Sequence, residues 1–172
     1  VVEKNNNKSW WKKKLLSHFY FYDKNFHILV QNLTSLVLLN IKFEFIQNSI
    51  NISDEAFNSV QTKLAKLEIN NFIIFHPSAQ YKYKILPKHL RNDLLFQLSK
   101  FNIPIIVTGT NNKIDLEIKR DLPLLNNIFN FIGETSLEEY FALSELSLAY
   151  IGMDTLNMHI AASQNKRIFA IF

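Results

Sequence analysis

One segment of the sequence, residues 150–163, combines the end of an apolar run, a glycine and a cluster of polar side chains. The run 146–151 predicts a buried strand, Gly152 predicts a turn, and the alanine-containing stretch after it predicts a helix. Four polar residues fall in the turn and the first helical residues: Asp154, Thr155, Asn157 and His159. Free N–H groups at the start of a helix attract anions, phosphate above all. The segment therefore predicts a site for a phosphorylated ligand.

A second polar loop, residues 75–87, follows the first predicted strand of the same sheet. Ser78 and the backbone around it can donate hydrogen bonds to a phosphate, and Lys84 can reach the same phosphate as a point charge. A single loop lysine is more often simply solvated. His76 precedes a proline at the strand end, and we interpret it as a packed turn histidine rather than a base.

The histidines show no spacing typical of a metal site, and the chain has no cysteine. We therefore predict neither a metal nor a cofactor.

The elements that position these side chains follow from the hydrophobic pattern. Helices are predicted over 26–41, 53–67, 87–100, 113–122, 136–144 and 158–164. Strands are predicted over 72–75, 104–108, 128–132, 146–151 and 168–172, with a short extended piece over 43–46. Apolar strands that alternate with helices indicate an α/β fold, with a Rossmann-like parallel sheet covered by helices on both faces.

Local signals support several of these boundaries. Ser53 is expected to cap its helix, Ser136 and Glu139 form a predicted capping box, and Pro87 suits a first helical position. The three glycines of the chain, Gly109, Gly133 and Gly152, each follow a predicted strand. They are expected to line the carboxyl rim of the sheet, where ligands bind, or to serve as turns with positive φ.

Composition limits the class of protein. With 172 residues, 48% apolar and 20% charged, the chain can bury a real core, which excludes wholesale disorder. The net charge is +4, and five lysines of the first 14 residues supply much of it. We interpret this basic run as a solvated end rather than a patch for anionic lipid or nucleic acid. No apolar run approaches the roughly 20 residues that span a bilayer.

Five short motifs, in order, resemble glycosyltransferase family 9, the ADP-heptose:lipopolysaccharide heptosyltransferases and their relatives. The motifs are His76-Pro-Ser-Ala, Lys84-x-x-Pro87, Val107-Thr-Gly109, Ile132-Gly-x-Thr-Ser-Leu137, and Gly152-x-Asp-Thr-x-x-Met-His159 followed by Ala161-Ala162. The resemblance covers about residues 25–172 and implies the GT-B arrangement of two facing Rossmann-like domains. It divides the chain into a basic, loosely ordered segment 1–24, a helical remnant or linker 25–70, and a nucleotide-sugar-binding domain 71–172 that is truncated at its C-terminal end.

The resemblance also implies roles for individual residues. Ser78 and Lys84 would contact the donor diphosphate, and Asp154 would lie near the sugar and diphosphate. Thr155 would bind phosphate at the helix start. The remaining donor-binding residues would be Thr135 against the base, Asp115 on the ribose with Glu117 as second choice, and His159 of the last motif.

The implied reaction is an inverting transfer of a heptose-type sugar from an ADP-linked donor to a lipopolysaccharide core acceptor. The family places its catalytic base in the N-terminal domain, which this chain lacks, so we leave open whether the chain alone is an enzyme. The expected location is cytoplasmic, with peripheral contact at the inner face of the inner membrane as an open possibility. The expected partners are a nucleotide-sugar donor and a lipid A core acceptor, without nucleic acid.

The chain departs from the family pattern at three positions. Leu156 stands where the family usually has glycine, Leu86 where it often has tryptophan, and Thr110 where it has a second glycine. A leucine Cβ restricts φ and crowds the approach of the backbone to a phosphate. Two alternatives therefore stay open: a degenerate, non-catalytic nucleotide-binding domain, and a GT-B enzyme with a UDP-linked donor.

Overall fold

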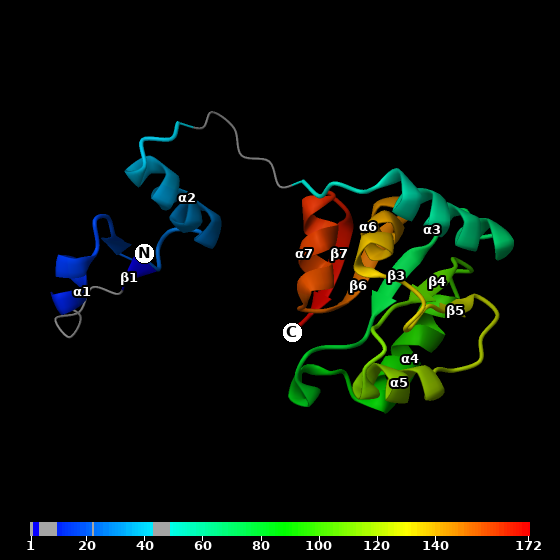
Figure 1. Ribbon diagram of the computed structural model, residues 1–172. Helices are drawn as coiled ribbons and strands as arrows, with labels where there is room; N and C mark the ends of the chain where they lie inside the picture. Colours follow the sequence, from blue (N-terminus) through cyan, green and yellow to red (C-terminus); the bar gives the residue numbers. More distant parts are fainter. Residues whose placement is uncertain (1, 4–9, 22, 43–48) are drawn as a thin grey trace. The chain divides into compact units, whose positions relative to one another are not determined.

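The computed structural model describes residues 2–3, 10–21, 23–42 and 49–172, and the chain divides into two compact units, Val1–Gln47 and Asn48–Phe172 (Figure 1). In the first unit, strand β1 (Val2–Glu3) pairs in parallel with β2 (Tyr20–Phe21), and helix α1 spans Trp10–Leu15. Helix α2 (Ile28–Leu38) confirms the helix predicted there. The extended piece predicted over 43–46 lies outside the described residues.

The second unit is an α/β domain, which confirms the predicted fold class. Its five strands are β3 (Ile73–His76), β4 (Ile105–Val107), β5 (Ile128–Asn130), β6 (Ala149–Met153) and β7 (Arg167–Ile171). They are all parallel, in the order β5-β4-β3-β6-β7. Its helices are α3 (Asp54–Lys66), the short 3₁₀ helix η2 (Lys82–Lys84), α4 (Lys88–Ser99), α5 (Lys113–Arg120), α6 (Leu137–Leu146) and α7 (Leu156–Ser163).

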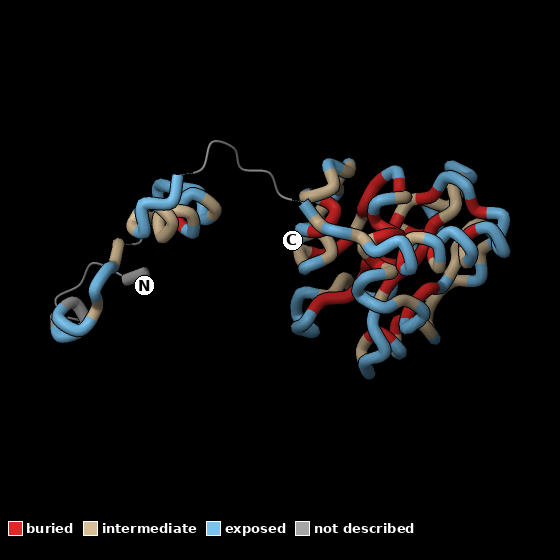
Figure 2. The backbone as a smooth tube through the Cα atoms, turned by 45° about the horizontal axis from the view of Figure 1, so that its top comes forward, coloured by how far each residue is buried: buried red, intermediate tan, exposed pale blue. Residues whose placement is uncertain are grey.

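The period-2 alternation of side chains along the strands builds a core on each face of the sheet. Ile74 and Ile106 pack on the face covered by α3, α6 and α7. Phe75, Ile105 and Val107 pack on the opposite face, beneath α4 and α5. Because both faces are covered, most residues of the central strands β3, β4 and β6 are apolar and buried, as the red segments at the centre of this unit in Figure 2 show. The compact unit begins at Asn48, so it includes α3 as well as the sheet.

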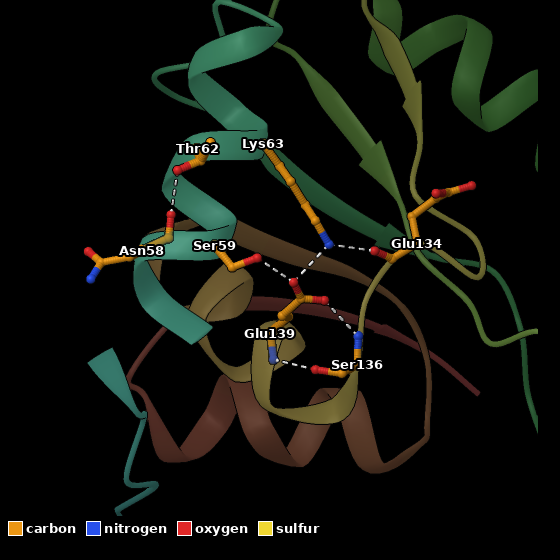
Figure 3. Close-up of polar contacts among 7 residues, drawn as sticks. All are labelled: Asn58, Ser59, Thr62, Lys63, Glu134, Ser136 and Glu139. Atoms are coloured by element: carbon orange, nitrogen blue, oxygen red, sulfur yellow. Dashed lines mark hydrogen bonds and ion pairs between the residues drawn. The ribbon is translucent and has the colours of Figure 1, made fainter. Parts of the chain in front are cut away.

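Helix starts follow the predicted signals. The Ser53 side chain accepts from the Ala56 N–H, and Ser136 and Glu139 form the capping box. Figure 3 shows that the same Glu139 carboxylate also accepts from Ser59 Oγ at 2.6 Å and from Lys63 Nζ at 2.8 Å on α3. Burial opposes ionisation of this carboxyl, but the hydrogen bonds from Lys63 and Ser59 outweigh it and lower the pKa of Glu139 to about 2. Helix α3 is thereby tied to the first turn of α6.

Two local predictions were wrong. Pro87 is the N-cap of α4 rather than its first residue. Gly152 lies inside β6 rather than in a turn, and its φ is not positive; of the three glycines only Gly133 has a positive φ, at 77°. A Cβ added at Gly152 would lie well inside contact distance of the His76 carbonyl oxygen on β3. Glycine is therefore needed here for close approach between strands.

Within the described residues, no helix combines the length and the apolar character needed to cross a membrane.

Candidate functional site

A pocket lies at the carboxyl edge of the sheet, where the strand order reverses. From β3 the chain proceeds to β4 and β5 on one side, whereas β6 and β7 lie on the other side. Ligands of open α/β sheets bind in the crevice at such a switch point. The pocket has a volume of about 480 Å³ and is lined by residues that follow β3, β4, β5 and β6. Six of the seven predicted donor-binding residues line it: Ser78, Lys84, Asp115, Thr135, Asp154 and Thr155.

Asp115 ties two loops of the pocket together. The carboxylate is 1% exposed, and it accepts a hydrogen bond from Ser78 Oγ of the loop that follows β3. Its second oxygen accepts from Thr110 N at 2.6 Å, Thr110 Oγ1 at 2.9 Å and Asn112 Nδ2 at 3.0 Å, in the loop that follows β4. Ser78 and Asp115, both predicted to contact the donor, thus contact each other. That either residue also touches a ligand stays a prediction.

His76 forms part of the pocket lining at the end of β3 and is 7% exposed. Burial lowers its pKa to about 4, against the opposing effect of the nearby Asp115 charge, so the imidazole is neutral at physiological pH. Its Nδ1 lies 2.9 Å from Asn157 Nδ2 and 3.1 Å from Thr108 Oγ1. Nδ1 is thus engaged by Thr108 at the end of β4 and by Asn157 on α7. His76 is packed, as predicted, but it belongs to the strand rather than to a turn.

The start of α7 faces the same pocket. Thr155 is the N-cap and makes no capping hydrogen bond through its side chain, which differs from the capped starts of α3, α5 and α6. Asp154 precedes it, and Leu156, 61% exposed, follows as the first helical residue. The positive end of the helix dipole and the exposed Lys84 are the features of this lining that favour an anion.

Two residues considered from the sequence lie elsewhere. His159 is absent from the pocket lining; its side chain is 69% exposed, and its Nε2 lies 3.9 Å from Asp154 Oδ1. Glu117, the second choice for a ribose contact, lines a separate groove beside α4 and η2.

Several lining residues were not named as site residues from the sequence: Tyr81, Thr110, Asn112 and Tyr140. Asn157 was placed in the predicted phosphate-binding segment but was given no role of its own. Asn112 was detectable, because it caps α5 by accepting from Asp115 N at 2.9 Å, and Asn before a helix is a common cap. The contact of Asn157 with His76 joins residues 81 positions apart, and nothing in the local sequence indicates it.

Comparisons with known proteins place the chain in a family. The sequence model of "Glycosyltransferase family 9 (heptosyltransferase)" matches residues 17–172. A search of curated proteins gave no significant match.

Among solved structures, a family 9 glycosyl transferase from Veillonella parvula DSM 2008 superposes with a TM-score of 0.79 at 16% identity, covering 94% of this chain and 48% of that one. The E. coli ADP-heptose lps heptosyltransferase II superposes with a TM-score of 0.63 at 20% identity, covering 78% of this chain and 42% of that chain. The E. coli heptosyltransferase WaaC with ADP superposes with a TM-score of 0.67 at 14% identity, covering 94% of this chain and 50% of that chain.

The chain thus spans about half the length of these solved structures. Its fold corresponds to one half of a GT-B glycosyltransferase, as the sequence motifs predicted. Together with the family match over most of its length, this shows that the chain belongs to glycosyltransferase family 9.

Proposed function

We propose that this chain is the donor-binding half of an inverting glycosyltransferase, which moves a heptose-type sugar from an ADP-linked donor to a lipopolysaccharide core acceptor. The observation that carries the proposal is the position of the pocket. It lies at the switch point between β3 and β6, with the start of α7 and Lys84 in its lining. Family membership and the similarity to a heptosyltransferase solved with ADP support the choice of donor.

The chemistry proposed for these residues is stabilisation of the leaving group. When the acceptor hydroxyl displaces the nucleotide at the anomeric carbon, negative charge grows on the diphosphate. The first N–H groups of α7 are held in place by the helix and would stabilise that charge, and the Lys84 ammonium in the same lining would add a positive charge beside it.

We further propose that proton removal from the acceptor belongs to a residue outside this chain. A positioned base typically contributes roughly 10²–10⁴-fold to the rate of such a step. The proposed reaction takes place at the cytoplasmic face of the inner membrane, where the acceptor is anchored. Donor binding is then the activity expected of this chain by itself.

The test is calorimetric titration of the full chain with ADP and, separately, with UDP. We expect saturable binding of ADP and weaker binding of UDP. Removing a charge-assisted hydrogen bond costs about 1.5–3 kcal/mol, so Lys84→Ala should weaken ADP binding by roughly 10- to 100-fold. The matched control is Lys100→Ala, at the C-cap of α4 and outside the pocket lining, which should leave ADP binding unchanged.

Each alternative has its own outcome. A preference for UDP over ADP would reject the heptosyl donor in favour of a UDP-linked sugar. The degenerate-domain alternative rests on Leu156, which is exposed at the start of α7 within the pocket lining. Absence of binding to either nucleotide by a chain shown to be folded would support that alternative and contradict the proposal.

A further inference from the structure

A lysine outside the pocket fixes the backbone of a loop that lines it. The loop joins β5 to α6 and spans residues 131–136. Lys63, on α3, donates from Nζ to the Glu134 carbonyl oxygen at 2.8 Å and to Glu139 Oε1 at 2.8 Å (Figure 3). Lys63 itself is absent from the pocket lining. Because a hydrogen bond from an ammonium is stronger than a neutral one, Lys63 sets the direction of this carbonyl.

A second lysine holds the same loop from the other face of the sheet. Lys119, on α5, donates from Nζ to the Ile132 carbonyl oxygen at 2.9 Å and to Glu134 Oε1 at 2.9 Å. Since β5 is an edge strand, the loop that follows it has neighbouring backbone on one side only, where the Gly133 N–H donates to the Gly109 carbonyl at 3.0 Å. The two lysines therefore add restraints that the sheet does not provide there.

The contact with Lys63 leaves one backbone donor of the loop unpaired. The Glu134 carbonyl and the Thr135 N–H belong to one trans peptide unit, so they point in opposite directions. With the carbonyl directed at Lys63, the N–H is directed away from α3. This N–H has no hydrogen-bond partner among the residues that the structure describes. Since Thr135 lines the pocket, the N–H is available to an acceptor atom of a ligand there.

The neighbouring lining residues favour a flat, partly apolar group. Leu137, the first residue of α6, lines the pocket and is 55% exposed, and Tyr140 lines it one turn further on. A backbone donor beside exposed apolar surface suits a nucleobase, whose ring faces are apolar and whose edge carries hydrogen-bond acceptors. The features that favour an anion, Lys84 and the start of α7, come from other elements of the lining.

We propose that Lys63 is a positioning residue for recognition of the nucleobase, acting through the peptide unit of Glu134 and Thr135, and that Lys119 supports it from the other face. The inference rests on the proposed function, because it places the nucleobase of the donor against residues 135–137 and the diphosphate at the start of α7. Neither lysine touches the ligand. Loss of either ammonium loosens the loop and weakens the contact with the base, while the contact with the phosphates is kept.

Two ligands separate the base from the phosphates: ADP, and inorganic pyrophosphate, which has no base. Each is titrated into the full chain by calorimetry. Lys63→Met keeps the aliphatic stem and removes the ammonium. We expect it to weaken ADP binding by about three- to tenfold, as for the loss of about one hydrogen bond, and to change pyrophosphate binding by less than about twofold. Lys119→Met should weaken ADP binding in the same way.

Two further variants separate the role of the ammonium from general effects on α3. Lys63→Arg keeps a charged donor and should retain ADP affinity within about twofold. The matched control is Lys66→Met, which removes an exposed ammonium from the last turn of the same helix. It should leave the affinity for both ligands unchanged.

A spectroscopic signal follows the proposed contact directly. In the isotope-labelled chain, ADP should shift the backbone amide of Thr135 in the wild type and in Lys63→Arg, and shift it much less in Lys63→Met. Pyrophosphate should leave this amide unchanged in all three proteins.

A loss of affinity confined to ADP, restored by Lys63→Arg, supports the inference. ADP affinity that is equal in the wild type and both methionine variants overturns it, and so does an equal loss for ADP and pyrophosphate. A Thr135 amide that ADP does not shift in the wild type also overturns it, although saturable ADP binding would then still support the proposed function. Absence of ADP binding by the folded wild type rejects the proposed function and the inference together.

Discussion

The hydrogen bonds of Asp115 predict that Asp115→Ala destabilises the domain and weakens nucleotide binding together. The carboxylate accepts four hydrogen bonds from the loops after β3 and β4. Ser78 is 5% exposed, so its hydroxyl would lose its partner while buried, at a cost of about 1–3 kcal/mol. The donors of Thr110 and Asn112 are nearer the surface and can turn to water. Loss of an acid in the first turn of α5 adds about 0.3–1 kcal/mol.

Together these effects amount to about 1.3–4 kcal/mol, which for a domain of this size corresponds to a Tm lowered by roughly 4–12 °C. Thermal unfolding followed by circular dichroism measures the shift, and calorimetry with ADP measures the affinity. The Tm of Asp115→Asn should lie between those of the wild type and Asp115→Ala, because the amide keeps the shape of the side chain and one hydrogen-bond acceptor. Glu117→Ala is the control on the same helix, where the side chain makes no polar contact within the described residues and should shift stability by less than about 0.5 kcal/mol.

A Tm for Asp115→Ala within about 2 °C of the wild type would mean that the Asp115 hydrogen bonds do not stabilise the domain. If ADP affinity then fell while stability held, the carboxylate would act on the ligand itself, as the sequence suggested, rather than through the loops.

Three further predictions follow from the described contacts. The pKa of Glu139 is lowered to about 2 from an ordinary 4.5, so the stability that its carboxylate contributes is complete above pH 4.5 and is lost as the pH falls toward 2. Urea unfolding at pH 6 and at pH 3 should therefore show a larger decrease in the free energy of unfolding for the wild type than for Glu139→Gln. Leu156→Gly should tighten ADP binding by about three- to tenfold, because it removes a Cβ beside the helix start, and calorimetry showing unchanged or weaker binding would count against crowding there. Gly152→Ala should destabilise the domain by about 2 kcal/mol or more through collision with the His76 carbonyl, and a Tm equal to that of the wild type would contradict the close strand approach.

Most of the fold could be predicted because its signals are local. Buried parallel strands appear as short apolar runs, and the caps Ser53 and Ser136 fix helix starts within a residue or two. Gly152 was misinterpreted because the reason for glycine lies on the neighbouring strand. His76 pairs with Gly152 in the parallel register, and the sequence alone does not show which residues become neighbours on adjacent strands.

The sequence predicted which loops form the candidate site but not which side chains contact each other there. Polar residues at strand ends indicated where a ligand would bind, and the sheet gathers six of the seven in one pocket. Asp115 could not be distinguished in sequence from a ribose ligand, because an acid near a helix start suits either role. Its partner Ser78 lies 37 residues away. His159 shares a motif with Asp154 and Thr155, yet its side chain is directed to solvent rather than to the pocket lining.

We propose that the start of α7 and Lys84 hold the diphosphate of an ADP-linked donor. The most direct measurement is an NMR titration of the isotope-labelled full chain with ADP, followed at the backbone amides. We expect the largest shifts on residues 155–158 and smaller ones in the loops after β3 and β4, and we expect Lys84→Ala to suppress both. Shifts confined to the opposite end of the sheet, or saturable ADP binding that leaves the amides of 155–158 unmoved, would contradict it.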